Sequence, residues 1–70
     1  MSGTITVNGE PRQLTGPETV AGLLQADGTD MEQGGLAVAL NGEVVPRVDW
    51  QGTRINPDDT VEIVHIVRGG

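Results

Sequence analysis

Two Asn-Gly dipeptides constrain the fold of this chain more than any other feature of its sequence. Asn8-Gly9 and Asn41-Gly42 each separate two short runs of strand-forming character. Asn-Gly favours the type I′ turn, in which both central residues take positive φ, and this turn joins two antiparallel strands closely. The sequence therefore predicts two tight hairpins, with strands expected at residues 4–7, 10–14, 36–40 and 43–45.

Between the two hairpins, apolar residues follow a helical spacing. Val20, Leu23 and Leu24 fall at positions i, i+3 and i+4, which lie on one face of an α-helix. We expect a helix over residues 18–26. Gly22 lies inside it and weakens it by up to about 1 kcal/mol relative to alanine.

The ends of this helix carry their own signals. Thr15 and Glu18 have the spacing of a capping box, and Thr19 is an alternative N-cap, so two starting points remain open. Asp27 and Gly28 then mark the end, because glycine tolerates the left-handed conformation that follows many helices. A polar loop is expected from Gly28 to residue 35.

Residues 36–40 form a continuous apolar run, which predicts a buried strand, and residues 60–67 form the longest β-branched run. The order is β-β-α-β-β-β, and one helix can cover only one face of a small sheet, so the class is α+β. If the first and last strands pair in parallel at the centre, the arrangement resembles the β-grasp of ubiquitin-like domains. We expect a mixed sheet of four to five strands on one helix, with a domain at 1–67 and a flexible tail at 68–70.

Composition excludes several classes of function. The chain has no cysteine, which excludes disulfides, thiolate ligands and a cysteine nucleophile. Its net charge is −6, which disfavours binding to nucleic acid or to an anionic membrane. Neither a signal peptide nor a membrane-spanning run is visible, so a soluble, cytoplasmic protein is expected.

The Gly69-Gly70 pair is the candidate functional element. Glycine has no Cβ, so its backbone can enter a channel that is too narrow for other residues. A free carboxylate is a poor electrophile and must first become an acyl-adenylate, which requires ATP and an activating enzyme. The chain has no GxxxxGK[ST] loop of its own, which indicates a substrate of that step rather than its catalyst. The plain alternative is a tag remnant or a frayed end.

An ordered set of residues resembles the ThiS family of bacterial sulfur carriers over nearly the whole length. Val45-Pro46-Arg47 followed by Trp50 is the most distinctive part. The remaining matches are Thr19-Val20, Leu23-Leu24, Ala39-Leu40-Asn41, Asp59, Val61-Glu62-Ile63-Val64, Val67 and Gly69-Gly70. The chain departs from the usual family pattern at Gly22, Val64 and Arg68, which leaves the particular pathway open.

The resemblance implies a protein cosubstrate and not an enzyme, with no bound cofactor and no catalytic or metal-binding residues of its own. A ThiF-like adenylyltransferase would activate the Gly70 carboxylate with ATP and Mg²⁺. Sulfur from a cysteine desulfurase or another donor would then replace AMP, giving a thiocarboxylate. The thiazole synthase ThiG would take this sulfur for thiamin. The alternatives are a MoaD-like carrier for molybdopterin or another metabolite, and a ubiquitin-like binding module whose tail is never activated.

Alternation along the last strand predicts a second site. Residues 61, 63, 65 and 67 share one face, and residues 62, 64, 66 and 68 share the other. By comparison with ubiquitin, Val61 and Ile63 of the first set enter the core. Val64, Ile66 and Arg68 then form a candidate patch for docking the activating enzyme. The alternative is ordinary strand composition or cover by the segment around Trp50.

Five further residues have structural interpretations. Trp50, the only aromatic residue, is expected to anchor the irregular segment 47–55. His65 has no accompanying nucleophile or ligand set and is expected to be partly buried and structural. Arg47 is expected to pair with a carboxylate of its own chain or of a partner. Asp58-Asp59 is expected to form a turn and no metal site.

Overall fold

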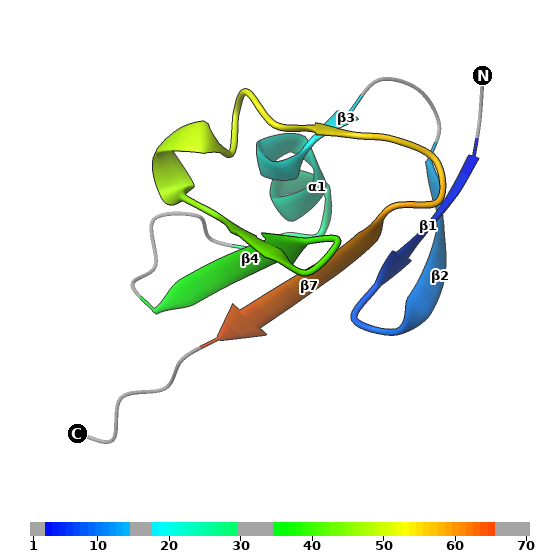
Figure 1. Cartoon of the computed structure of the whole chain (residues 1–70), viewed down its shortest axis with the longest axis horizontal. Helices are drawn as coiled ribbons and strands as arrows, with labels where there is room; N and C mark the ends of the chain where they lie inside the picture. The colour runs from blue at the N-terminus through cyan, green and yellow to red at the C-terminus, as the bar shows by residue number, and fades with distance from the viewer. Residues whose placement is uncertain (1–2, 15–17, 30–34, 66–70) are drawn as a thin grey trace.

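A computed structural model describes residues 3–14, 18–29 and 35–65 (Figure 1). These ranges contain β-strands, one α-helix and one short 3₁₀ helix. The elements are β1 (Gly3–Val7), β2 (Glu10–Leu14), β3 (Glu18–Thr19), α1 (Val20–Ala26), β4 (Leu36–Leu40), β5 (Glu43–Val45), the 3₁₀ helix η1 (Arg47–Asp49), β6 (Arg54–Ile55) and β7 (Thr60–His65).

The main sheet has five strands in the order β2-β1-β7-β4-β5, and α1 lies against one of its faces (Figure 1). β1 and β7 are parallel neighbours, with Thr6 opposite Thr60 and Val7 opposite Val61. The other pairs in this sheet are antiparallel. This confirms the expected α+β class and the central, parallel position of the first and last strands.

Both predicted hairpins are confirmed. Asn8 and Gly9 have φ of 52° and 82°, and Asn41 and Gly42 have φ of 52° and 85°. Positive φ at both central residues is the signature of the type I′ turn, whose twist matches that of the flanking strands. The turns fix the registers of β1 on β2 and of β4 on β5.

The helix begins two residues later than the expected residue 18. Thr19 is the N-cap, and its Oγ1 accepts a hydrogen bond of 3.1 Å from the amide of Gly22. Glu18 and Thr19 are instead extended and pair with β6. Thr15, the rival cap residue, lies outside the described residues. The predicted end is confirmed, since Asp27 is the C-cap and Gly28 has φ of 75°.

The segment after β5 fixes this late start. The carbonyl of Thr53 accepts a 3.0 Å hydrogen bond from the amide of Val20, the first helical residue. The carbonyl of Trp50 accepts one of 3.0 Å from the amide of Ala21, the second. These amides have no partner within the helix, so acceptors from another segment stabilise the helix end. The segment 47–55 is therefore more regular than expected, because it contains η1 and β6.

The core lies between α1 and the sheet. Trp50 is buried, and its Nε1 donates a 2.8 Å hydrogen bond to the carbonyl of Val45, which confirms its predicted role as an anchor. The other buried apolar side chains among the described residues are Ile5, Val7, Leu14, Val20, Ala21, Leu23, Leu24, Val38, Val45, Ile55, Val61 and Ile63. The strand predicted at 36–40 is present as β4, but it is less buried than expected. Val38 is buried, Leu36 and Leu40 on the same face are partly buried against the core, and Ala37 and Ala39 lie on the face that the helix does not cover.

Candidate functional site: the open sheet face beside the last strand

The side chains of β7 alternate as predicted. Val61 and Ile63 enter the core, with exposed fractions of 0% and 8%. Glu62 and Val64 point to the other face, and Val64 is 50% exposed. The helix cannot reach this second face, so its side chains are available to another molecule.

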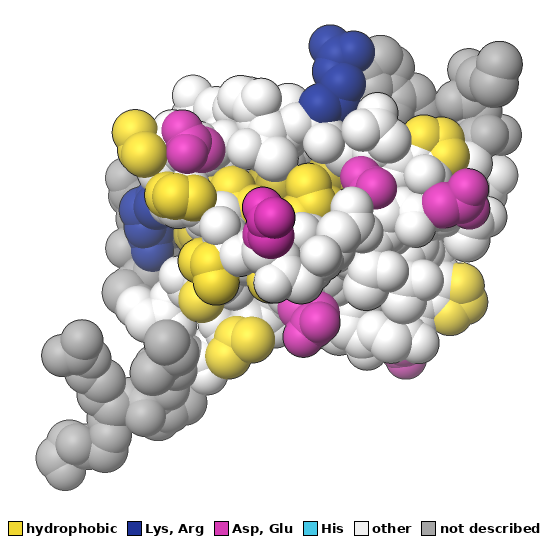
Figure 2. Space-filling model, viewed as in Figure 1, with side chains coloured by type: hydrophobic (Ala, Val, Ile, Leu, Met, Phe, Trp, Pro, Cys, Tyr) yellow, Lys and Arg dark blue, Asp and Glu magenta, His cyan; other side chains and the backbone are white. Residues whose placement is uncertain are grey.

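The face that carries Val64 is mostly apolar over three neighbouring strands, with one carboxylate, Glu62. Ala37 of β4 lies opposite Val64, and Ala39 lies between Glu62 of β7 and Val44 of β5. We call these five residues the outer face. Val44 is 75% exposed. Figure 2 shows hydrophobic side chains gathered on one side of the molecule, with acidic side chains among them. An apolar patch with charged neighbours is typical of a protein-binding surface.

Val44 is a component of this surface that sequence reasoning missed. It precedes the buried Val45, so the alternation of a strand already places it on the opposite face. The antiparallel register set by the Asn41-Gly42 turn then brings it next to Ala39. Val48, on η1, is a further exposed apolar residue, at 86%.

Most of the predicted site lies outside the described residues. This holds for Ile66 and Arg68 of the predicted docking patch, and for Gly69 and Gly70. Val64 is exposed as expected, but its role in docking stays a prediction. The division into a domain at 1–67 and a tail at 68–70 also stays a prediction.

His65 differs from expectation, because it is exposed rather than partly buried. It lies opposite Leu36 at the end of the described strand, past the buried part of β7. Within the described ranges, no group of three His, Cys, Asp or Glu residues is placed to hold a metal ion.

Asp58 and Asp59 form the predicted turn. Asp58 has φ of 71°. The carboxylate of Asp59 accepts hydrogen bonds from the Asn56 amide at 2.8 Å and from Asn41 Nδ2 at 3.0 Å. Asp59 therefore links two loops of the fold, which is a structural role.

Arg47 lies beside the anchor residue of its segment. Its guanidinium carbon is 4.8 Å from the centroid of the Trp50 ring, a cation–π geometry. The predicted pairing of Arg47 with a carboxylate stays a prediction.

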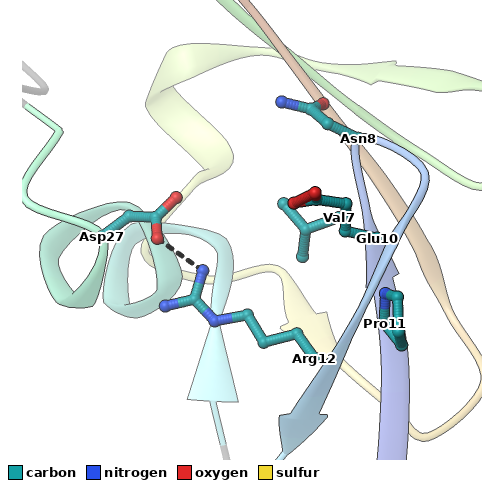
Figure 3. A pocket seen from close by; sticks show the side chains of 6 residues that line it. All are labelled: Val7, Asn8, Glu10, Pro11, Arg12 and Asp27. Atoms are coloured by element: carbon teal, nitrogen blue, oxygen red, sulfur yellow. Dashed lines mark hydrogen bonds and ion pairs between the residues drawn. The ribbon is translucent and has the colours of Figure 1, made fainter.

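A pocket of about 210 Å³ lies on the helix side of the sheet, between the β1–β2 turn and the end of α1. Figure 3 shows Arg12 of β2 and Asp27 of the helix C-cap meeting at its edge, where Arg12 Nη1 is 2.6 Å from Asp27 Oδ1. The remaining lining residues are Val7, Asn8, Glu10 and Pro11. Two carboxylates and one guanidinium leave this pocket with one net negative charge.

Comparisons with known proteins place this geometry in a family. The crystal structure of the thiamine biosynthesis protein ThiS from Geobacter metallireducens superposes with a TM-score of 0.80 at 33% identity, covering 96% of this chain and 99% of that one. The sulfur carrier protein ThiS of Escherichia coli is 30% identical over 66 residues, covering 94% of this chain and 97% of its own length. A model of the ThiS family matches residues 5–70.

A longer protein is also similar. The thiazole synthase of Paramagnetospirillum magneticum is 35% identical over 66 residues, which are 94% of this chain. The chain spans only 20% of the length of that synthase. A region similar to this chain is therefore one part of a larger protein there.

The mixed five-stranded sheet on one helix, with an open face beside the last strand, defines a ubiquitin-like β-grasp protein. Within that class, the chain belongs to the ThiS sulfur-carrier family. No helix in the described ranges is long and apolar enough to cross a membrane.

Proposed function

We propose that this protein carries sulfur for thiamin biosynthesis as a thiocarboxylate on Gly70. The observation that carries the proposal is the ThiS family match, which extends from residue 5 to residue 70 and so includes both glycines. The E. coli relative that is named a sulfur carrier matches over 97% of its own length.

The chemistry takes place on the backbone carboxylate. An oxygen of the Gly70 carboxylate attacks the α-phosphorus of ATP, pyrophosphate leaves, and an acyl-adenylate forms. A sulfide equivalent then attacks the acyl carbon, AMP leaves, and the thiocarboxylate remains. The chain has no cysteine that could hold the sulfur, which is consistent with an acyl carbon as the site of attachment.

The enzymes that handle Gly70 are other proteins. A ThiF-like adenylyltransferase binds MgATP and catalyses the adenylation. The sulfur comes from a sulfide donor, or from the persulfide of a cysteine desulfurase together with a thiol that reduces it to the sulfide level. The acceptor is a thiazole synthase of the ThiG type. The similarity between this chain and one part of a thiazole synthase supports that acceptor, because linking a carrier domain to its acceptor enzyme raises the effective concentration of one for the other. We place these events in the cytoplasm.

Docking of the activating enzyme is assigned to the predicted patch of Val64, Ile66 and Arg68. The exposure of Val64 and its position opposite Ala37, on the same face of the sheet as Val44, support this assignment. An apolar surface next to the strand that leads to the tail would hold the body of the carrier while the glycines enter the active site.

Intact-mass measurement tests the proposal. The protein is incubated with a ThiF-like enzyme, MgATP and a sulfide donor, and the mass should rise by one oxygen-to-sulfur exchange. A ubiquitin-like module that is never activated would show neither adenylate nor thiocarboxylate. Offering the loaded protein to thiazole synthase and to molybdopterin synthase then separates a thiamin carrier from a MoaD-like one.

A further inference from the structure

The two neighbours of β7 cover different lengths of it. β4 pairs with β7 as far as His65, which lies opposite Leu36. β1 pairs with it only at Thr60 and Val61, because the chain turns away at Asn8. In Figure 1, β7 continues past the tip of the β1–β2 hairpin.

The direction of the backbone groups shows which donors and acceptors of β7 lie beyond the end of β1. The carbonyls of Asp59 and Val61 accept hydrogen bonds of 3.0 and 2.9 Å from the amides of Thr6 and Asn8. Backbone groups of alternate residues point to the same side of a strand. The carbonyl of Ile63 and the amide of His65 therefore also point to the β1 side, where the register of β1 has already ended.

Asn8 marks the boundary of this open edge. Its Oδ1 accepts a 2.7 Å hydrogen bond from the amide of Ile63, so a side chain takes the place of the next residue of β1. Asn8 also lines the pocket that contains Glu10, Arg12 and Asp27. The open edge and the pocket are thus contiguous, and Figure 3 shows Asn8 at the pocket's rim.

We propose that an extended segment of the activating enzyme adds to the sheet as a strand alongside Ile63–His65, and that a Lys or Arg side chain of this segment enters the pocket beside Glu10. The inference rests on the proposed function, because it assigns the partner that handles Gly70. An exposed strand edge offers unpaired donors and acceptors to an added strand, and alternate side chains of that strand point to the helix side of the sheet, where the pocket lies.

Charge favours a cationic partner segment over a second copy of this chain. The pocket has one net negative charge, and Asp27 already neutralises Arg12. The whole chain has a net charge of −6, so two copies repel each other. A segment with Lys or Arg would be attracted to this edge, most strongly at low ionic strength.

Proline at position 65 tests the backbone part of the proposal. His65→Pro removes the amide on the open side but no donor to β4, while His65→Ala keeps the amide and serves as its control. Loss of one interfacial hydrogen bond should weaken binding to the ThiF-like enzyme about three- to tenfold relative to His65→Ala. Equal affinities of the two variants would overturn the proposal.

Hydrogen exchange tests the same contact without a mutation. The amide of His65 in the wild-type chain should exchange more slowly when the ThiF-like enzyme is bound with MgATP, and unchanged exchange would overturn the proposal even if the proline variant fails to fold. Edge pairing between copies, detected as a dimer that His65→Pro abolishes, would overturn the choice of occupant.

Glu10→Gln tests the pocket, and Glu43→Gln, the same charge change at the start of β5, is its control. Only Glu10→Gln should weaken binding, about threefold, and the difference should disappear at high salt. Equal effects of the two changes would overturn the pocket contact. Mass spectrometry of the wild-type chain distinguishes a failure of the strand-edge proposal from a failure of the proposed function. If the chain is loaded with sulfur but shows none of these binding effects, only the strand-edge proposal is refuted. If the chain is never loaded, the proposed function is refuted, and this partner with it.

Discussion

Trp50 reaches back over five positions to donate its indole N–H to the carbonyl of Val45, at 2.8 Å in the buried interior. The bond fixes the segment that also caps the start of α1 through the carbonyls of Trp50 and Thr53. One side chain therefore supports both the packing of the 3₁₀ segment and the position of the helix.

Trp50→Phe should destabilise the fold by about 1–3 kcal/mol. Phenylalanine retains most of the apolar volume but leaves the carbonyl of Val45 buried without its donor. It also provides a weaker face for the Arg47 guanidinium. Urea denaturation measures the change, and Val48→Ala, at an exposed position of the same segment, is the control that should remain close to wild type. Equal stability of Trp50→Phe and wild type would show that the hydrogen bond contributes nothing.

Gly22→Ala should stabilise the protein by up to about 1 kcal/mol. A Cβ at this helical position would lie 3.5 Å from Glu18 Cγ and from Thr19 Oγ1, which is ordinary contact. Alanine also restricts the unfolded chain more than glycine does. Gly42→Ala is the contrasting variant, because φ of 85° strains any side chain there and should lower stability. Thermal unfolding of both variants checks the two opposite signs.

Asn41→Asp should destabilise the protein at neutral pH and much less in acid. Asn41 Nδ2 donates to Asp59 Oδ1 at 3.0 Å, while Asn41 Oδ1 accepts from the amide of Thr60 at 2.8 Å. The substitution replaces the donor by a carboxylate oxygen that faces another carboxylate. This repulsion requires both groups to be ionised, so stability relative to wild type should fall as pH rises and recover as pH falls.

Denaturation of the Asn41→Asp variant and of wild type at several pH values measures this difference. Asn41→Ser, which replaces the Nδ2 amide donor by a shorter hydroxyl and adds no charge, is the control and should show no such pH trend. A constant difference between Asn41→Asp and wild type across the pH range would contradict the repulsion.

Local signals in the sequence predicted those parts of the fold that local chemistry determines. Asn8-Gly9 and Asn41-Gly42 required positive φ, so both hairpins and their registers followed. The start of the helix could not be obtained in this way. Thr15 and Thr19 offered comparable local caps, and the choice depended on carbonyls some thirty positions further along, in the segment 50–53.

The same distinction between local and long-range determinants applies to the candidate site. Alternation along β7 was enough to predict that Val64 is exposed. The contribution of Val44 depends on the pairing of β5 with β4, and the open edge at His65 depends on where β1 leaves β7. Both features depend on pairing between different strands, which hydrophobic periodicity within a single strand does not predict.

Charge on the outer face should weaken binding to the activating enzyme and leave the fold intact. Val44→Asp and Val64→Asp each place a carboxylate in the apolar patch, at side chains that are 75% and 50% exposed. A desolvated charge in an interface typically costs more than 1 kcal/mol, so affinity should fall about tenfold. Thr4→Asp, on the same side of the sheet but on β1, is the matched control and should bind normally. If all three variants bind alike, the outer face is not the docking surface.

Removal of Gly70 should abolish sulfur loading while leaving stability unchanged. The buried residues of the described chain lie between Ile5 and Ile63, so the core does not depend on this glycine. Without it, the reactive carboxylate is displaced by one residue, about 3.5 Å along an extended chain, which is enough to remove it from an active site that positions atoms closely. Mass spectrometry after incubation with the ThiF-like enzyme, MgATP and sulfide should show no thiocarboxylate, and urea denaturation should match wild type. Loss of folding would instead show that the tail is structural, and normal loading of the shortened chain would show that the enzyme does not measure the position of Gly70.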